Sequence, residues 1–411
     1  MTNFDPQRVR TDIPLMRRVI NGRPITYLDS GASSLTPRTV IEAMDRYYEN
    51  HHANVHRGVY QTANESTAIY EGGREAAARF LNAPGGSGEI VFTKNATESF
   101  NLLARSWGTK FLAPGDVVLV TEMEHHANIV PWFQLREAHG IEVRFIPVGD
   151  DYRLDLSRIE ELMQGVKLVS VTGMSNVLGS INPIRELADM AHAHGALIAV
   201  DGAQSVAHLP TDLVDLDIDF LAFSAHKMLG PTGLGIFWTR ADILESMPPF
   251  LGGGGMIKDV SVDGYTPAGG PTRFEAGTPP IAEVAGFSAA VQYLEDLGLD
   301  NIAAYEKELT GDALTRLARN FGDTLRVIGP ADTLERGGVI SLDVKGVHPH
   351  DVAQVLDQFG VCVRPGHHCA KPLMKRFGLA ATARASYGPY SLVDDTDVLL
   401  EALAHAVEMF A

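Results

Sequence analysis

Seven short apolar runs between residues 89 and 239 constrain the fold more than any other feature of the sequence. Each run is rich in β-branched residues, and several are separated by amphipathic stretches such as residues 184–194. Strands that are apolar along their whole length are typical of parallel sheets covered on both faces. The sequence therefore predicts an α/β fold with a mostly parallel central sheet and helices on both faces. The runs are EIVFT, DVVLVTE, EVRFIPV, KLVSVTG, ALIAVDG, DFLAFSA and GLGIFWT.

The pattern changes from about residue 301. A long helical stretch, residues 305–321, precedes strand-like GGVISLDV, helical PHDVAQVLDQFG, strand-like VCVR and a closing helix. This order predicts a smaller α+β domain that is joined by the N-terminal segment. We expect a large domain over residues 21–294 and a small domain formed by residues 1–20 and 295–411.

Composition excludes several classes of protein. The formal net charge is −17, whereas nucleic-acid-binding surfaces are basic. No apolar run approaches the roughly 18 residues of a membrane span, and the N-terminus lacks the apolar core of a secretory signal. Two cysteines cannot form a disulfide framework. These observations predict a cytoplasmic protein without nucleic-acid or membrane partners, in a reducing setting where a thiol stays reactive.

Lys227 lies in SAHKMLGPTGLG, directly after the apolar run DFLAF. Burial penalises the charge of a lysine at the end of a strand, so this position is a poor structural choice. A surface lysine in a turn is the simpler interpretation. However, Ser224 and His226 are residue types that bind phosphate, and the glycine-rich turn allows close backbone approach. A lysine with a lowered pKa forms a Schiff base with an aldehyde cofactor.

Two further strand ends carry polar groups. Asp201 ends the run ALIAVD, where it either caps a turn or pairs with a protonated pyridine nitrogen. Gln204 follows three residues later, within reach of a phenolic oxygen on the same ring. KNATES follows EIVFT and opens a helix, so the backbone at Ala96 and Thr97 forms either an ordinary N-cap or a phosphate cradle.

His125 lies in TEMEHHANIVPW, again just after an apolar run. The neighbouring His126, together with His367, His368 and Cys369, raises the alternative of a zinc site. Four ligands at recognised short spacings are not evident, so we predict no metal. An imidazole stacked on a cofactor ring fits the position of His125 better, and it can also move protons near neutral pH.

The two cysteines occupy different surroundings. Cys362 alternates with valines in GVCVR, as expected for a small core residue. Cys369 lies in the polar loop RPGHHCAKP, beside two histidines and downstream of Arg364. Such surroundings favour the reactive thiolate, although an exposed bystander cysteine is the alternative. Arg384, in TARASYG, either grips an α-carboxylate with its planar fork or forms a surface salt bridge.

Taken in order, these motifs resemble the SUF-type (group II) cysteine desulfurases, including selenocysteine lyase-like members, of the class V aminotransferase superfamily. The resemblance extends from HANVHRG at residues 52–58 through the last helix. SAHKMLGPTG and GHHCA together are highly specific. The other motifs that carry it are EHHANIVPW, SNVLGSINP, DGAQ, RFEAGTP and RPGHHCAKP.

The resemblance implies pyridoxal 5′-phosphate (PLP) as cofactor, on a fold of PLP-dependent type I. Lys227 would bind the cofactor covalently and later move protons, and His125 would stack on the ring. Asp201 would pair with the pyridine nitrogen, and Gln204 with the phenolic oxygen. The residues that would bind the phosphate are Ala96, Thr97, Ser224 and His226, with Thr278 reaching across from the neighbouring subunit of a homodimer.

The same resemblance places the substrate, L-cysteine. Asn176 and Arg384 would hold its carboxylate, with Arg364, His56 and the backbone near Ala32 close by. Cys369 would attack the substrate sulfur, which leaves a persulfide on the enzyme and releases alanine. The persulfide would then pass to an acceptor protein, for a use such as iron–sulfur cluster assembly. GGGGMIKDVSVDGY resembles the hairpin that covers the site in this group.

Two stretches depart from the family pattern, YLDSGASSLTP near the N-terminus and PYSLVDD after Arg384. Both bear on substrate preference rather than on PLP binding. The alternatives are a selenocysteine lyase, another PLP-dependent reaction such as a C–S lyase, epimerase or aminotransferase, and an inactive PLP-binding scaffold in sulfur transfer.

Overall fold

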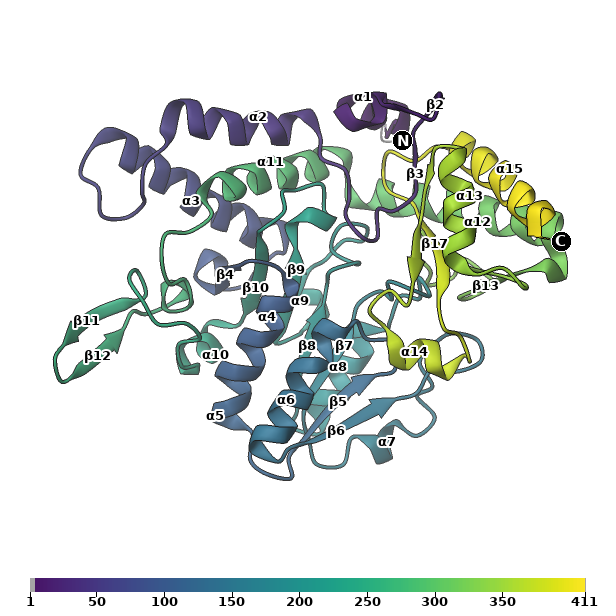
Figure 1. Cartoon of the computed structure of the whole chain (residues 1–411). Helices are drawn as coiled ribbons and strands as arrows, with labels where there is room; N and C mark the ends of the chain where they lie inside the picture. Colours follow the sequence, from purple (N-terminus) through teal and green to yellow (C-terminus); the bar gives the residue numbers. More distant parts are fainter. Residues whose placement is uncertain (1–3, 411) are drawn as a thin grey trace.

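The seven apolar runs form one seven-stranded sheet in the computed structural model, which describes residues 4–410 (Figure 1). β10 pairs antiparallel with both of its neighbours, and the other pairs are parallel. The predicted α/β fold with a mostly parallel sheet is therefore confirmed. The strands in spatial order are β4 (Ile90–Thr93), β10 (Gly235–Thr239), β9 (Phe220–Ser224), β8 (Leu197–Asp201), β7 (Val166–Thr172), β5 (Val117–Thr121) and β6 (Glu142–Ile146).

Alternate residues of each strand belong to two different apolar clusters. Val117 and Leu119 pack in the cluster with α3, α8 and α11, whereas Val118 and Val120 pack with α4 and α6. The sheet thus buries both faces, which explains why its strands read as unbroken apolar runs. The helices around it are α2 (Arg38–Arg46), α3 (Gln61–Phe80), α4 (Ala96–Leu103), α5 (Thr109–Phe111), α6 (Val130–His139), α7 (Ile159–Leu162), α8 (Ile184–Ala193), α9 (Leu213–Leu216), α10 (Ala241–Ser246) and α11 (Ile281–Leu297).

A second, antiparallel sheet lies in the C-terminal part of the chain. Helices α12, α13 and α15 pack on it around a separate apolar cluster. The predicted order of elements is present, but VCVR does not form a single strand. Val361–Cys362 pairs with β3 (Thr26–Tyr27), whereas the chain from Arg364 pairs with β17 (Thr382–Ser386). The elements are α12 (Leu299–Phe321), β13 (Leu325–Ile328), β14 (Val339–Val344), α13 (Pro349–Gln358), β15 (Val361–Cys362), β16 (Arg364–Gly366), α14 (Lys371–Arg376), β17 (Thr382–Ser386) and α15 (Val393–Phe410).

The N-terminal segment contacts both parts of the chain. Val9 and Ile13 belong to the apolar cluster of the large sheet, whereas Arg10 pairs with Asp395 of α15 at 2.7 Å. Residues 1–3 and 411 of the predicted small domain lie outside the described part, and the domain boundary stays a prediction. The remaining elements here are α1 (Pro6–Asp12), β1 (Val19–Ile20), β2 (Arg23–Pro24) and β3 (Thr26–Tyr27).

A hairpin of β11 (Ile257–Ser261) and β12 (Gly264–Pro267) projects from the body of the protein (Figure 1). Its apolar residues Val260, Val262 and Tyr265 are exposed. The hairpin predicted from the sequence is thus present, but within this chain it extends outward. Among the described residues, no helix combines the length and the apolar character that a membrane span requires.

Candidate active site

One cavity of about 230 Å³ lies where strands of the large sheet end. Every residue predicted for the site lines it, except His56 and Thr278. The residues that line the cavity come from distant parts of the sequence. β17 and the loop of Cys369, in the C-terminal part of the chain, approach the ends of the strands of the large sheet. The predicted residues in this cavity are Ala32, Ala96, Thr97, His125, Asn176, Asp201, Gln204, Ser224, His226, Lys227, Arg364, Cys369 and Arg384.

Lys227 ends a 3₁₀ turn, η6 (Ala225–Lys227), that follows β9 directly. The accessible part of its side chain borders the cavity. Loss of hydration lowers the pKa of Lys227 to about 8, and the nearby Arg384 and Arg364 act in the same direction, while Asp201 opposes them. The amine is therefore a substantially better nucleophile near neutral pH than an ordinary lysine.

Asp201 is the last residue of β8 and is 3% exposed. Its Oδ1 accepts a hydrogen bond from the Ala203 N–H at 2.9 Å, and the carboxylate borders the cavity. Burial raises the pKa of Asp201, although the Ala203 N–H and Lys227 oppose the shift. A buried carboxylate that faces a cavity needs a cationic partner, so the position fits a protonated ring nitrogen. Gln204 donates to the Gly31 carbonyl at 2.7 Å and lines the same space.

The start of α4 forms one end of the cavity. The Ala96 N–H donates to Ser224 Oγ at 2.9 Å, and the Glu98 N–H donates to the side chain of Asn95 at 3.0 Å. Thr97 lies between these two amides and lines the cavity. A Cβ at Gly235 would lie 2.5 Å from the Asn95 backbone, so glycine is needed for β10 to approach this turn. A helix start with small and hydroxyl side chains around it fits a phosphate group.

His125 is fixed by its own turn. Its Nδ1 accepts a hydrogen bond from the Ala127 N–H at 3.1 Å, which leaves the proton of the neutral ring on Nε2. Burial and the positive charge of Lys227 lower the pKa of His125 to about 3, so the ring is neutral throughout the physiological range. A neutral, flat ring at the cavity wall is suited to stacking on a cofactor.

Sequence analysis missed Glu124, which lies directly before His125 and is fully buried. Its carboxylate accepts hydrogen bonds from the Thr172 N–H at 2.8 Å, from Thr121 Oγ1 at 2.7 Å and from Asn128 Nδ2 at 2.7 Å. Burial raises its pKa to about 8. Glu124 thus ties the turn of His125 to β7. The sequence did contain a signal, because Glu124 is a carboxylate close to the end of an apolar strand, as Asp201 is.

Arg384 is 2% exposed and reaches the cavity from β17. It donates to the Asn176 carbonyl at 3.0 Å and to Asp29 Oδ1 at 3.1 Å, which was not predicted from the sequence. Burial lowers the pKa of Arg384 despite Asp29. A guanidinium held in this way retains donors for a substrate carboxylate.

Cys369 is half-buried and lines the cavity, whereas Cys362 is half-buried elsewhere and packs against the apolar core. Burial raises the pKa of the Cys362 thiol. His368, which also lines the cavity, was considered only as a metal ligand from the sequence. Within residues 4–410, no three His, Cys, Asp or Glu side chains are grouped as metal ligands would be.

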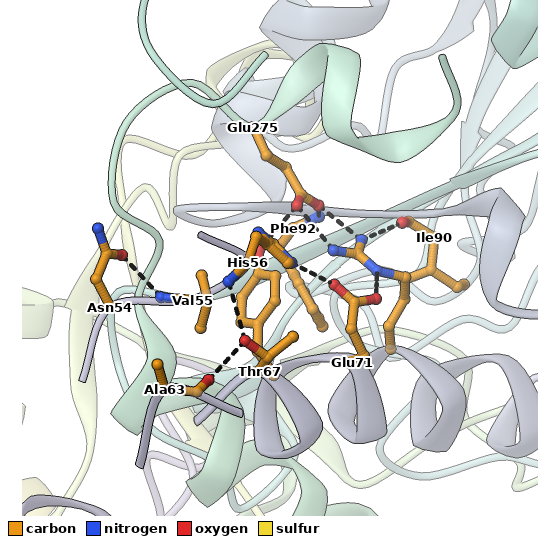
Figure 2. A network of polar contacts seen from close by, with 11 residues as sticks. Asn54, Val55, His56, Ala63, Thr67, Glu71, Ile90, Phe92 and Glu275 are labelled. Carbon is orange, nitrogen blue, oxygen red and sulfur yellow. Dashed lines mark hydrogen bonds and ion pairs between the residues drawn. The ribbon is translucent and has the colours of Figure 1, made fainter. Parts of the chain in front are cut away.

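His56 and Thr278 line a second cavity, of about 500 Å³. Figure 2 shows how His56 is held: its N–H bonds to Thr67 Oγ1 and its Nε2 lies 2.9 Å from Glu71 Oε1. Glu71 contacts Arg74, which forms a buried ion pair with Glu275 at 2.7 Å. This network runs from His56 to Glu275, and Thr278 lines the same cavity. The cavity that holds Lys227 includes neither His56 nor Thr278.

The two stretches that depart from the family pattern contact each other. Ser30 Oγ lies 2.8 Å from the hydroxyl of Tyr390, which also accepts a hydrogen bond from the Leu35 N–H. Ser34 Oγ in turn donates to the His226 carbonyl and accepts from the Leu229 N–H. Ser34 therefore supports the backbone on either side of Lys227. Within the first stretch, Gly31 and Ala32 line the cavity.

Comparisons with known proteins identify the family of this chain. Residues 26–399 match the family model described as aminotransferase class-V, and the chain belongs to this family. A probable cysteine desulfurase of Streptomyces coelicolor is 46% identical over 99% of this chain and 98% of that protein. The apo structure of a cysteine desulfurase from Thermococcus onnurineus has a TM-score of 0.94 at 41% identity, covering 100% of both chains.

A crystal structure of a cysteine desulfurase from Escherichia coli has a TM-score of 0.91 at 36% identity and covers 99% of this chain and 100% of that one. The predicted resemblance to cysteine desulfurases and the PLP-dependent type I fold are thus confirmed. The SUF-type subgroup stays a prediction.

We expect the apo protein to react with PLP at a rate that rises with pH through a midpoint near 8. The reason is that only the unprotonated amine of Lys227 attacks the aldehyde. The rate is measured from the absorbance of the imine. The Lys227→Ala variant gives the background from imines at surface lysines. The reaction of PLP with a free lysine derivative corrects for the titration of PLP itself. Asp201→Asn should lower the midpoint further. A midpoint at about 10.4, the ordinary lysine value, would contradict the assignment.

Proposed function

We propose that this protein is a PLP-dependent cysteine desulfurase that converts L-cysteine to L-alanine and carries the sulfur as a persulfide on Cys369. The observation that carries the proposal is that Lys227 and Cys369 line one cavity, together with Asp201, His125 and Arg384. The relatives named cysteine desulfurases support the same activity.

The cavity offers a position for each part of the cofactor. Lys227 would hold the aldehyde carbon and Asp201 the ring nitrogen. His125 would cover the ring, and Gln204 would bind the phenolic oxygen. The phosphate would lie at the start of α4, against Ala96, Thr97, Ser224 and His226. Bound PLP supplies an electron sink that stabilises negative charge at the substrate Cα.

The substrate carboxylate would bind Arg384, whose position is set by Asp29 and Asn176. Arg364 adds positive charge nearby, and the backbone at Ala32 lines the same wall. Lys227, with its lowered pKa, is suited to take the proton from the substrate Cα and return it. The sequence suggested that His125 could also move protons near neutral pH, but its pKa lies far below neutral. Its proposed role is therefore stacking alone.

Sulfur transfer requires the Cys369 thiolate to attack the sulfur of the bound substrate. A new S–S bond forms while the C–S bond breaks, so the sulfur is oxidised and the carbon reduced. The electron pair of the broken bond remains on the substrate, where protonation gives alanine. No external oxidant is needed, and a later thiol or acceptor protein removes the persulfide.

We further propose a homodimer in which His56 and Thr278 complete the site of the partner subunit. The second cavity lies apart from Lys227 in this chain, and the exposed apolar hairpin β11–β12 projects outward. In a symmetric pair, Thr278 would approach the partner's phosphate, His56 the partner's substrate, and the hairpin would cover the partner's cavity. The SUF-type subgroup, a cytoplasmic location and iron–sulfur cluster assembly belong to the same proposal.

Product analysis of the PLP-loaded protein with L-cysteine and a thiol reductant tests the activity. We expect equal amounts of alanine and sulfide, lost in Cys369→Ala and retained in the matched control Cys362→Ala, because only Cys369 borders the cavity. Pyruvate and ammonia would instead identify a C–S lyase. Activity on selenocysteine that does not depend on Cys369 would favour a selenocysteine lyase, and absence of any product would leave a PLP-binding scaffold.

Subunit mixing tests the shared site. Lys227→Ala and Thr278→Asp subunits should each be inactive alone, the second because a carboxylate repels the phosphate. In the mixed dimer one site keeps both native residues, so random exchange should restore about a quarter of the parent activity. Activity that stays absent after exchange, with mixed dimers present, would contradict the shared site.

A further inference from the structure

The turn that carries Cys369 has an unfavourable backbone conformation. His368 has φ +51° and Cys369 has φ +54°, a region that non-glycine residues rarely adopt. Two such residues in succession cost free energy that the surrounding contacts must supply. The turn therefore keeps its shape only as long as these contacts hold it.

Part of the support comes from the turn itself. The Cys369 N–H donates to His367 Nδ1 at 3.1 Å, and the Ala370 N–H donates to the His367 carbonyl at 2.9 Å. On the side of the large sheet, Asn176 Nδ2 donates to the His368 carbonyl at 2.8 Å. The His368 ring is also held, because its Nε2 lies 2.9 Å from Thr382 Oγ1. These two contacts fix the start of the turn.

His126 holds the end of the turn at two points. Its N–H donates to the Cys369 carbonyl at 2.7 Å, and its Nε2 accepts from the Lys371 N–H at 3.1 Å. The His126 ring also lies 5.7 Å from the ring of His367, centroid to centroid. The two hydrogen bonds of His126 thus hold both ends of the stretch from Cys369 to Lys371. Lys371 is the first residue of α14.

We propose that His126 is a positioning residue that holds Cys369 in its orientation toward the cavity. Its side chain acts through one acceptor, Nε2. The neighbouring His125 lines the cavity. The two adjacent histidines thus have different roles: His125 faces the proposed cofactor position, and His126 holds the turn of Cys369. The effect of His126 on sulfur transfer rests on the proposed desulfurase function. Its effect on the conformation of the turn does not.

The test compares His126→Ala with His126→Gln, whose side-chain oxygen can still accept from the Lys371 N–H. The control is His139→Ala, a partly buried histidine on α6 outside the cavity. Hydrogen exchange in the PLP-loaded proteins reports on the turn, absorbance reports on the cofactor, and alanine formation reports on sulfur transfer.

We expect exchange of the amides at residues 369–371 to be about tenfold faster in His126→Ala, because local opening costs less. Alanine formation should fall about tenfold in kcat with PLP affinity and KM for L-cysteine nearly unchanged, since a displaced nucleophile slows only the transfer. His126→Gln should recover most of both losses, and His139→Ala should match the parent.

Unchanged exchange at residues 369–371 in His126→Ala would overturn the proposal, as would a loss of PLP affinity with the turn intact. If the parent protein forms no alanine, the desulfurase function fails. The exchange data then still decide whether His126 holds the turn.

Discussion

Burial of the large sheet on both faces restricts where this chain can place charge. Alternate residues of each strand pack into opposite apolar clusters, so the inner strands carry ionisable groups only at or beside their ends. Asp201 ends β8, and Lys227 follows β9 in the next strand position of the sheet. The same low hydration that makes these two charges costly lowers the pKa of Lys227 and makes its amine reactive.

The C-terminal part of the chain completes the cavity from the opposite side. Arg384 arrives on a buried strand, whereas Cys369 arrives on a turn with two left-handed residues. A rigid strand would suit the carboxylate-binding role proposed for Arg384. A turn held by separate hydrogen bonds would suit the sulfur-carrying role proposed for Cys369. Asn176 and His126 connect this turn to the large sheet.

Much of this could be predicted from the sequence, because local patterns report on burial. All seven apolar runs are strands of one sheet, and polar residues after them, such as Lys227 and Asp201, share one cavity. Asp29 was missed because its role depends on contact with Arg384, which is 355 residues away in the chain. The split of VCVR was also missed, since the two halves differ only in their partners, β3 and β17. His56 lies with Thr278 in a second cavity. No local pattern encodes this separation for His56, whereas the family resemblance had already assigned Thr278 to the site of a neighbouring subunit.

The most direct measurement is peptide mapping of the PLP-loaded protein after brief exposure to L-cysteine, without reductant or acceptor. Trapping with an alkylating agent followed by mass spectrometry locates any added sulfur. One extra sulfur atom on Cys369, and none on Cys362, is the predicted result, with fragmentation of the peptide locating the sulfur. Alanine formation with no sulfur on Cys369 would contradict the assignment of Cys369 as the sulfur acceptor.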